Sequence, residues 1–286
     1  MPKALLVLLV ALAAAIPAAA RPLDLARSPS PFRGVGSWVS IYDTAAWRSP
    51  ERVVRTLARH RVRTLYLETA NHRQPVAVVR RDRVVRFLTA AHAAGIDVVG
   101  WYLPSFAHPA RDVARAVAGA RFRTPDGDGF DGFALDIEAT TVRSIGVRSR
   151  RAVAFAAAVR RALGPTLPLG AITIDPVGAR YWPRYPFRAL APSVDVFLPM
   201  EYFTARTRGP RRVAAYSAAN IRAVRRLAGD ARFAVHPIGG EARHATLREV
   251  RAFLRASTAE GTVGASLWEY AQTTPRQWAA LASAGR

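Results

Sequence analysis

Eight apolar runs of strand-like length recur along this chain, and each is followed by a segment with helical or partly helical periodicity. The runs begin near Val35, Val62, Ile96, Phe130, Leu169, Val194, Phe233 and Val263. Between them, Val84, Leu88 and Ala91 have the i, i+4, i+7 spacing of a helix with one apolar face. Because eight strand and helix units in alternation favour parallel strands that close into a ring, the sequence predicts an α/β fold, a single-domain (β/α)8 TIM barrel.

A doubly wound open sheet is the alternative, but such a sheet usually has fewer strands and a glycine-rich phosphate loop after the first one. Here the run 35–42 continues into Asp43-Thr44-Ala45-Ala46-Trp47, which is no such loop. Glycine also closes several helical segments just before the next strand, at Gly95, Gly164, Gly229 and Gly261. These features favour the barrel.

The N-terminal segment has a different composition from the rest of the chain. Lys3 precedes an apolar run from Ala4 to Ala15, and small residues follow up to Ala20. This pattern is typical of a secretory signal peptide, and the run is shorter than the ~20 residues of a membrane-spanning helix. We therefore expect a signal peptide over 1–20, a lead-in segment over 21–33 and the barrel over 34–286, in a protein exported to the extracellular space or cell wall, with no transmembrane segment after cleavage.

The charge and the residue types that are absent exclude several classes of site. The chain has no cysteine, so disulfides and thiolate ligands are excluded, and its six histidines show no metal-ligand spacing. No cofactor motif or metal site is expected. The net charge is +22, but the arginines are spread over the helices rather than clustered. We interpret this as compositional bias that causes salt-sensitive adhesion to polyanions without specific nucleic-acid binding. A monomer is expected.

Acidic and aromatic residues gather at the carboxyl ends of the predicted strands, although acids are the minority charge, 20 against 42. Functional groups of a (β/α)8 barrel lie at these ends. Carboxylates with flat rings suit sugar chemistry, because acids protonate the leaving oxygen and rings stack on pyranose faces. Candidate substrate-binding residues are therefore Glu68, Tyr102 and Asp175. A polysaccharide or cell-wall glycan is the expected partner.

The fourth strand carries the most specific pattern. Residues 130–138 alternate, so Ala134, Asp136 and Glu138 share one face while Phe133 and the apolar residues between them take the other. Two carboxylates then point into the barrel mouth. Like charges this close raise the pKa of one carboxyl, which can then act as a general acid. A buried acidic pair neutralised by arginine is the structural alternative.

Residues 131–138, Asp-Gly-Phe-Ala-Leu-Asp-Ile-Glu, resemble the fourth-strand motif of glycoside hydrolase family 18, the chitinases and related enzymes. Met200-Glu201-Tyr202 resembles that family's Met-x-Tyr, and Trp268 its eighth-strand tryptophan under the sugar. The resemblance implies that Glu138 is the general acid/base and that Asp136 orients the N-acetyl group of the substrate, which acts as nucleophile. It implies that Tyr202 hydrogen-bonds the same acetamide, with Met200 and Trp268 in the substrate site.

Two positions depart from the family 18 pattern. Ala134 stands where the family has an acid that sets the protonation of its neighbour, and Phe203 stands where Asp or Asn is usual. A weaker resemblance links Asp136-Ile137-Glu138 and Leu267-Trp268-Glu269-Tyr270 to family 25 muramidases. That family needs only the two carboxylates.

These observations predict a secreted glycoside hydrolase that cleaves a polysaccharide, one that contains N-acetylhexosamine. Two alternatives stay open: a non-catalytic, lectin-like barrel, which the loss of an acid at Ala134 would suit, and a family 25-like muramidase. Strand alternation further predicts that Glu201 and Glu269, each next to an inward aromatic residue, face the helices or sit at the rim. A bulge at either strand end would reverse that orientation.

Overall fold

Nine strand segments form a closed parallel barrel in a computed structural model that describes residues 30–284. The strands are β1 (Gly34–Val39), β2 (Thr64–Asn71), β3 (Asp97–Leu103), β4 (Gly132–Asp136), β5 (Leu169–Ile174), β6 (Val196–Met200), β7 (Ala234–Val235), β8 (Ile238–Glu241) and β9 (Gly264–Trp268). The short β7 and β8 both pair with β6 and together occupy the seventh position. Pairing of β1 with β9 and of β5 with β6 closes the ring. The predicted barrel is therefore confirmed.

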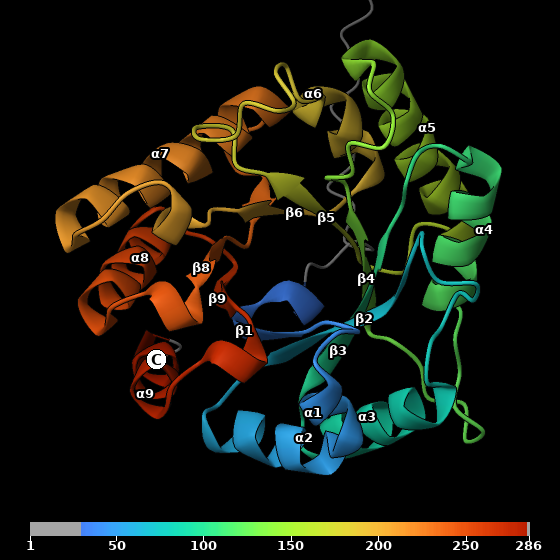
Figure 1. Cartoon of the computed structure of the whole chain (residues 1–286), viewed down its shortest axis with the longest axis horizontal. Coiled ribbons are helices and arrows are strands. Elements are labelled where there is room, and N and C mark those ends of the chain that lie inside the picture. Colours follow the sequence, from blue (N-terminus) through green and yellow to red (C-terminus); the bar gives the residue numbers. More distant parts are fainter. Residues whose placement is uncertain (1–29, 285–286) are drawn as a thin grey trace, which may run out of the picture.

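Helices surround the strands on the outside (Figure 1). They are α1 (Thr44–Arg48), α2 (Pro50–Arg59), α3 (Arg81–Ala93), α4 (Pro109–Ala120), α5 (Ile145–Leu163), α6 (Phe187–Leu190), α7 (Pro210–Ala228), α8 (Leu247–Ala259) and α9 (Pro275–Ala284). The four glycines expected at helix ends all have positive φ, as in Gly229 with φ +82° after α7. None of the helices within 30–284 is long and apolar enough to cross a membrane.

Strand alternation divides the core into two layers. Val35, Val39 and Phe133 face outward into the apolar layer between strands and helices. Trp38 and Ala134 face inward and pack inside the barrel. Because the side chains of a strand alternate between these layers, the identity of every second residue decides what the barrel mouth contains.

The end of the barrel where the strands begin is closed by the short 3-10 turn η1 (Ser30–Phe32). Phe32 is fully buried inside the barrel, and its backbone oxygen lies 2.8 Å from Nδ1 of the buried His236. A Cβ added at Gly170 would lie 2.8 Å from the Phe32 ring, so the ring fills the space that this glycine leaves. The last residues of the expected lead-in segment thus belong to the barrel. The expected signal peptide, 1–20, lies outside the described residues.

Candidate active site

A cavity of about 370 Å³ opens at the carboxyl ends of the strands. Carboxylates, aromatic rings and a few apolar side chains line it, namely Trp38, Ser40, Tyr42, Glu68, Asn71, Arg73, Trp101, Leu103, Asp136, Glu138, Ile172, Met200, Tyr202, Ile238, Trp268 and Glu269. Six of the eight residues expected at the site are in this set. They come from β2, β4, β6 and β9, so the fold brings together residues that are up to 200 positions apart in the chain.

The two carboxylates of the fourth strand both face this cavity. Phe133, Leu135 and Ile137 pack in the outer layer, so the intervening Asp136 and Glu138 point inward. The Tyr185 hydroxyl donates a 2.8 Å hydrogen bond to the backbone oxygen of Ile137. This bond fixes the backbone between the two acids just beyond the end of β4.

Burial favours the neutral forms of both acids, and for Asp136 the charges of neighbouring acids add to this effect. Asp136 is 6% exposed, and burial together with the charges of Glu138 and Glu68 raises its pKa well above the usual range. Burial also raises the pKa of Glu138, which is only partly buried. Oδ1 of Asp136 has no hydrogen-bond partner among the described residues. The pair can therefore retain a proton at a pH where an exposed carboxyl has lost its own.

Ala134 occupies the inward position below Asp136. It is fully buried in the inner layer and lies opposite Trp101 in the register of β3 and β4. No third carboxylate therefore lies beneath the pair on β4. The third carboxylate whose charge reaches Asp136 is Glu68, which comes from β2.

Tyr202 and Met200 extend the inward face of β6. Glu201 points the other way: it is fully buried near Ser217 of α7, and this burial raises its pKa well above the usual range. The expected outward orientation of Glu201 is thus confirmed. Burial and the charge of Glu138 raise the pKa of Tyr202, so its hydroxyl stays protonated and can donate a hydrogen bond into the cavity.

Phe203 follows Tyr202 and faces away from the cavity. It begins the short turn η3 (Phe203–Ala205), is fully buried and packs against Phe253 of α8, with ring centroids 5.7 Å apart. An Asp or Asn at this position would place a polar group in that apolar contact. Phe203, which differs from the Asp or Asn of the family 18 pattern, therefore packs in the outer core.

Three tryptophans form the aromatic side of the cavity. Trp38 lies at its base, with its ring centroid 6.1 Å from those of Trp101 and Trp268. The Trp38 indole donates a 2.8 Å hydrogen bond to Ser266 and stacks on Tyr66 at 4.1 Å. The candidates named from sequence include Tyr102 at the end of β3 and neither Trp38 nor Trp101. Strand alternation is the signal that could have found them, because Trp38 shares a strand face with Ser40 and Trp101 shares one with Leu103, and all four line the cavity.

We call Ser40, Tyr42, Glu68, Asn71 and Glu269 the acidic wall. Glu68 accepts hydrogen bonds from the backbone N–H of Ile41 at 2.9 Å and from Asn71 at 3.2 Å. Asn71 also donates to the Tyr42 hydroxyl at 3.0 Å. Burial raises the pKa of Glu68 to about 7, and the charge of Glu269 adds to this rise.

A register shift in β2 puts Asn71 into this wall. The pairing of β2 with β3 shifts between Glu68 and Ala70, so Ala70 packs in the outer layer and Asn71 lines the cavity. Strict alternation from Glu68 would have placed Ala70 inside instead. Sequence reasoning missed Asn71 for that reason.

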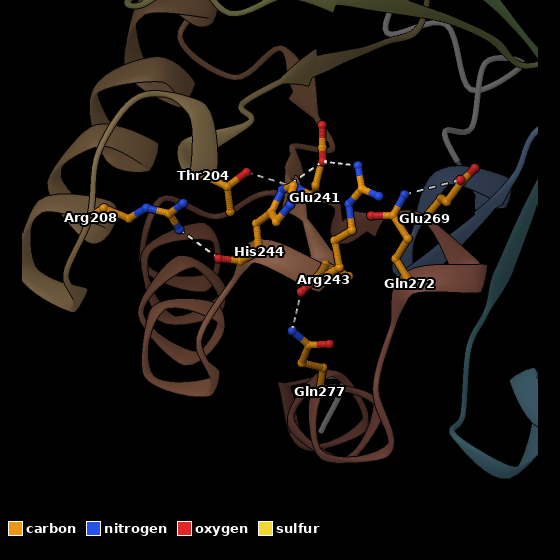
Figure 2. A network of polar contacts seen from close by, with 9 residues as sticks. Thr204, Arg208, Glu241, Arg243, His244, Glu269, Gln272 and Gln277 are labelled. Carbon is orange, nitrogen blue, oxygen red and sulfur yellow. Dashed lines mark hydrogen bonds and ion pairs between the residues drawn. The ribbon is translucent and has the colours of Figure 1, made fainter.

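The prediction that Glu269 faces the helices or sits at the rim is wrong, because Glu269 departs from the alternation of β9. The strand ends at Trp268, yet Glu269 lines the cavity beside it, and the peptide bond between the two is cis. Burial and the charge of Asp43 raise the pKa of Glu269, and Gln272 lies 3.4 Å from its Oε1. Figure 2 shows this contact next to a second group at the rim, in which Glu241 pairs with Arg243 and His244 at 3.4 and 3.0 Å.

Two expected site residues lie elsewhere. Tyr102 faces the helices, where its hydroxyl donates a 2.9 Å hydrogen bond to the buried Asp112 of α4. The assignment of Tyr102 to the substrate site is corrected because β3 alternates and its neighbour Trp101 takes the inward position. Asp175 does not line the cavity either. It accepts hydrogen bonds from the backbone N–H groups of Gly178 and Ala179 and pairs with Arg206 at 3.2 Å, so it holds the loop after β5.

Within 30–284, no group of three or more acidic or histidine side chains is arranged to hold a metal ion. The cavity combines a protonatable carboxylate pair, a phenol that donates a hydrogen bond and a set of indole rings. These groups can transfer a proton to, and stack against, a neutral polyhydroxylated ligand.

Solved structures share this fold at low sequence identity. A chitinase from Chromobacterium violaceum has a TM-score of 0.63 and 15% identity, over 88% of this chain and 98% of that chain. The C-terminal domain of a putative chitinase from Desulfitobacterium hafniense has a TM-score of 0.65 and 11% identity, over 89% and 99%. An endo-β-1,4-mannanase from Thermotoga petrophila has a TM-score of 0.63 and 11% identity, over 84% and 68%.

No protein-family model matches the sequence, and no curated protein matches it. The likeness is therefore one of fold. The chain is a TIM barrel like those of glycoside hydrolases, with chitinases and mannanases among its structural neighbours.

Proposed function

We propose that this chain is an exported glycoside hydrolase that cleaves a polysaccharide containing N-acetylhexosamine. The observation that carries the proposal is the Asp136–Glu138 pair, which lies in a cavity lined by tryptophans with the pKa of both acids raised. Export rests on the sequence of 1–20 alone. The barrel shared with chitinases supports the reaction class.

In the proposed reaction, Glu138 donates its proton to the glycosidic oxygen as the bond to the anomeric carbon breaks. Asp136 accepts a hydrogen bond from the acetamide N–H of the same sugar, and the Tyr202 hydroxyl donates one to the acetamide oxygen. That oxygen attacks the anomeric carbon. Glu138 then removes a proton from the water that opens the cyclic intermediate, which restores the acid and leaves the acetamide unchanged.

A second candidate function is glycan binding without cleavage. Ala134 favours it, because no third carboxylate lies below Asp136 on β4 to help move the proton within the pair. The aromatic side of the cavity would stack on sugar rings in either case. Only the chemistry at Glu138 separates the two functions.

The experiment measures release of reducing ends from chitin oligomers, peptidoglycan and exopolysaccharides by the wild type and by Glu138→Gln. An amide cannot donate the proton, and general acid catalysis is worth about 10²–10⁴-fold, so we expect turnover to fall by that factor. Asp126→Asn is the matched control, because Asp126 is exposed in the turn before β4, at the opposite end of the barrel.

Equal turnover by Glu138→Gln and the wild type would contradict the acid role. If the wild type binds a glycan but releases no reducing ends under any condition, binding without cleavage is the function. Ligand titration followed by tryptophan fluorescence provides the binding measurement, because three indoles line the cavity.

A further inference from the structure

The acids of the cavity have no cationic partners, which is unusual in this chain. Arginine and lysine outnumber acids by 42 to 20, and elsewhere they form close ion pairs such as Arg86 with Glu51 at 2.6 Å. Within 30–284, none of the ion pairs includes Glu68, Asp136, Glu138 or Glu269. Two cations lie nearby: the exposed Arg73, which lines the cavity, and Arg243, whose charge reaches Glu269 and which is paired with Glu241.

Neutral groups hold the two carboxylates of the acidic wall. Glu68 is bound by the backbone N–H of Ile41 and by the Asn71 amide. Glu269 has the Gln272 amide 3.4 Å from its Oε1, and its buried Oε2 has no hydrogen-bond partner among the described residues. Such partners orient a carboxylate without neutralising it. The pKa of both acids is raised, and an ammonium group that binds between them would favour their ionised forms with little competition from the protein.

Unpartnered polar atoms around the same cavity indicate that a polar ligand completes it. Oδ1 of Asp136 and Nε1 of Trp101 are buried without a hydrogen-bond partner, in side chains that are 6% and 4% exposed. One is an acceptor and the other a donor, and both residues line the cavity. Buried polar atoms in protein cores usually have a hydrogen-bond partner. These two atoms are therefore available to hydrogen-bond with hydroxyl and amide groups of a ligand.

We propose that the substrate is a partly deacetylated aminopolysaccharide, and that Glu68 and Glu269 of the acidic wall bind the ammonium group of a sugar with a free amine. This inference rests on the proposed function and names its substrate class. An ammonium donates three hydrogen bonds and is attracted by the indole face of Trp268 and by the ring of Tyr42, which is 63% exposed at the mouth. The acetylated sugar occupies the neighbouring position beside Asp136 and Tyr202.

The net positive charge of the protein means that nonspecific attraction cannot explain a preference for a cationic sugar. A chain of net charge +22 repels a cationic oligosaccharide at long range, so nonspecific attraction would favour an anionic or neutral ligand. Preference for the free amine can arise only where carboxylates dominate locally. The acidic wall and the Asp136–Glu138 pair are such a place.

The test measures binding to Glu138→Gln protein, in which cleavage is blocked. A partly deacetylated N-acetylglucosamine tetramer and the fully acetylated tetramer are titrated by calorimetry at about pH 7, where about half of Glu68 is ionised before the ligand binds and part of the sugar amine is charged. We expect the deacetylated tetramer to bind about tenfold more tightly, in line with a charged hydrogen bond. Adding Glu68→Gln and Glu269→Gln should reduce that ratio to about one.

The matched control adds Asp126→Asn and Asp230→Asn, which remove two exposed carboxylates near the ends where β4 and β7 begin. It should retain the preference. Circular dichroism and thermal unfolding show whether each variant is folded. Equal binding of the two tetramers, or an unchanged preference in the Glu68/Glu269 variant, would overturn the inference.

The outcomes separate this inference from the proposed function. If the wild type cleaves acetylated chitin oligomers and Glu138→Gln does not, while no amine preference exists, the function stands and the inference fails. If the amine preference depends on Glu68 and Glu269 but Glu138→Gln cleaves like the wild type, the inference stands and the catalytic role fails.

Discussion

Glu138 and Asp136 differ in burial, and this difference decides which of them can transfer a proton. Asp136 is nearly enclosed, whereas Glu138 is partly exposed to the cavity where a glycosidic oxygen would lie. Because the charge of Glu138 raises the pKa of Asp136, the protonation of one acid depends on that of the other. A ligand that accepts a hydrogen bond at Glu138, or donates one to Asp136, shifts a proton towards Glu138.

An acid introduced at Ala134 tests whether a third carboxylate on β4 improves proton transfer by Asp136 and Glu138. We expect Ala134→Asp to raise kcat, because a third carboxylate below Asp136 would share the proton. We also expect it to lower the free energy of unfolding by at least about 2 kcal/mol, since a polar group enters the apolar interior. Hydrolysis rates and urea denaturation measure the two effects.

Ala134→Asn serves as the control, because it has the same size without the ionisable group. It should lower the free energy of unfolding and leave kcat no higher than in the wild type. A rise in kcat with Asn as large as that with Asp would assign the effect to shape instead of protonation.

At the scale of elements, the alternation of β4 and β6 was enough to place Asp136, Glu138, Tyr202 and Glu201 from sequence. Alternation fails where a strand is irregular. The shift in β2 brings Asn71 inward, and Glu269 lies beyond the last residue of β9. Such irregularities depend on pairing with neighbouring strands, which a single sequence does not reveal.

The turn η1 shows a different limit of sequence reasoning. Residues 30–32 carry no strand or helix pattern, so the sequence does not indicate that they are buried. The structure shows that the Phe32 ring fills space inside the barrel at its closed end. We expect Phe32→Ala to lower the free energy of unfolding by about 3–5 kcal/mol, as for other fully buried phenylalanines. Urea denaturation measures it.

Phe32→Leu keeps most of the apolar volume and should cost less than Phe32→Ala. A loss below about 1 kcal/mol for Phe32→Ala would mean that the ring does not fill the interior, since surface substitutions fall in that range.

For the molecule as a whole, the raised pKa values of the buried acids predict that these groups contribute less stability as pH rises. An unfolded glutamate titrates near 4.5, whereas Glu68 in the folded protein titrates at about 7. Between these values the folded state binds more protons than the unfolded state, so the free energy of unfolding falls as pH rises. This carboxyl alone contributes a slope of up to ~1.4 kcal/mol per pH unit in that window.

Urea denaturation from pH 4.5 to 8 measures the slope, and Glu68→Gln should make it shallower because the amide does not titrate. Asp126→Asn should leave it unchanged, because that side chain is exposed. Equal slopes for Glu68→Gln and the wild type would show that Glu68 is better solvated than its burial indicates, because the opposing contribution of His236, whose pKa burial lowers to about 4, is the same in both proteins.

Phe32 also has a practical consequence for handling the protein. It fixes the chain at Ser30 to the end of the barrel opposite the cavity. A tag or partner domain fused ahead of Ser30 is therefore joined to the face turned away from the cavity mouth. Immobilised through such a fusion, the molecule would present its open end to the surrounding solution, where a long polymer chain can approach without crossing the support.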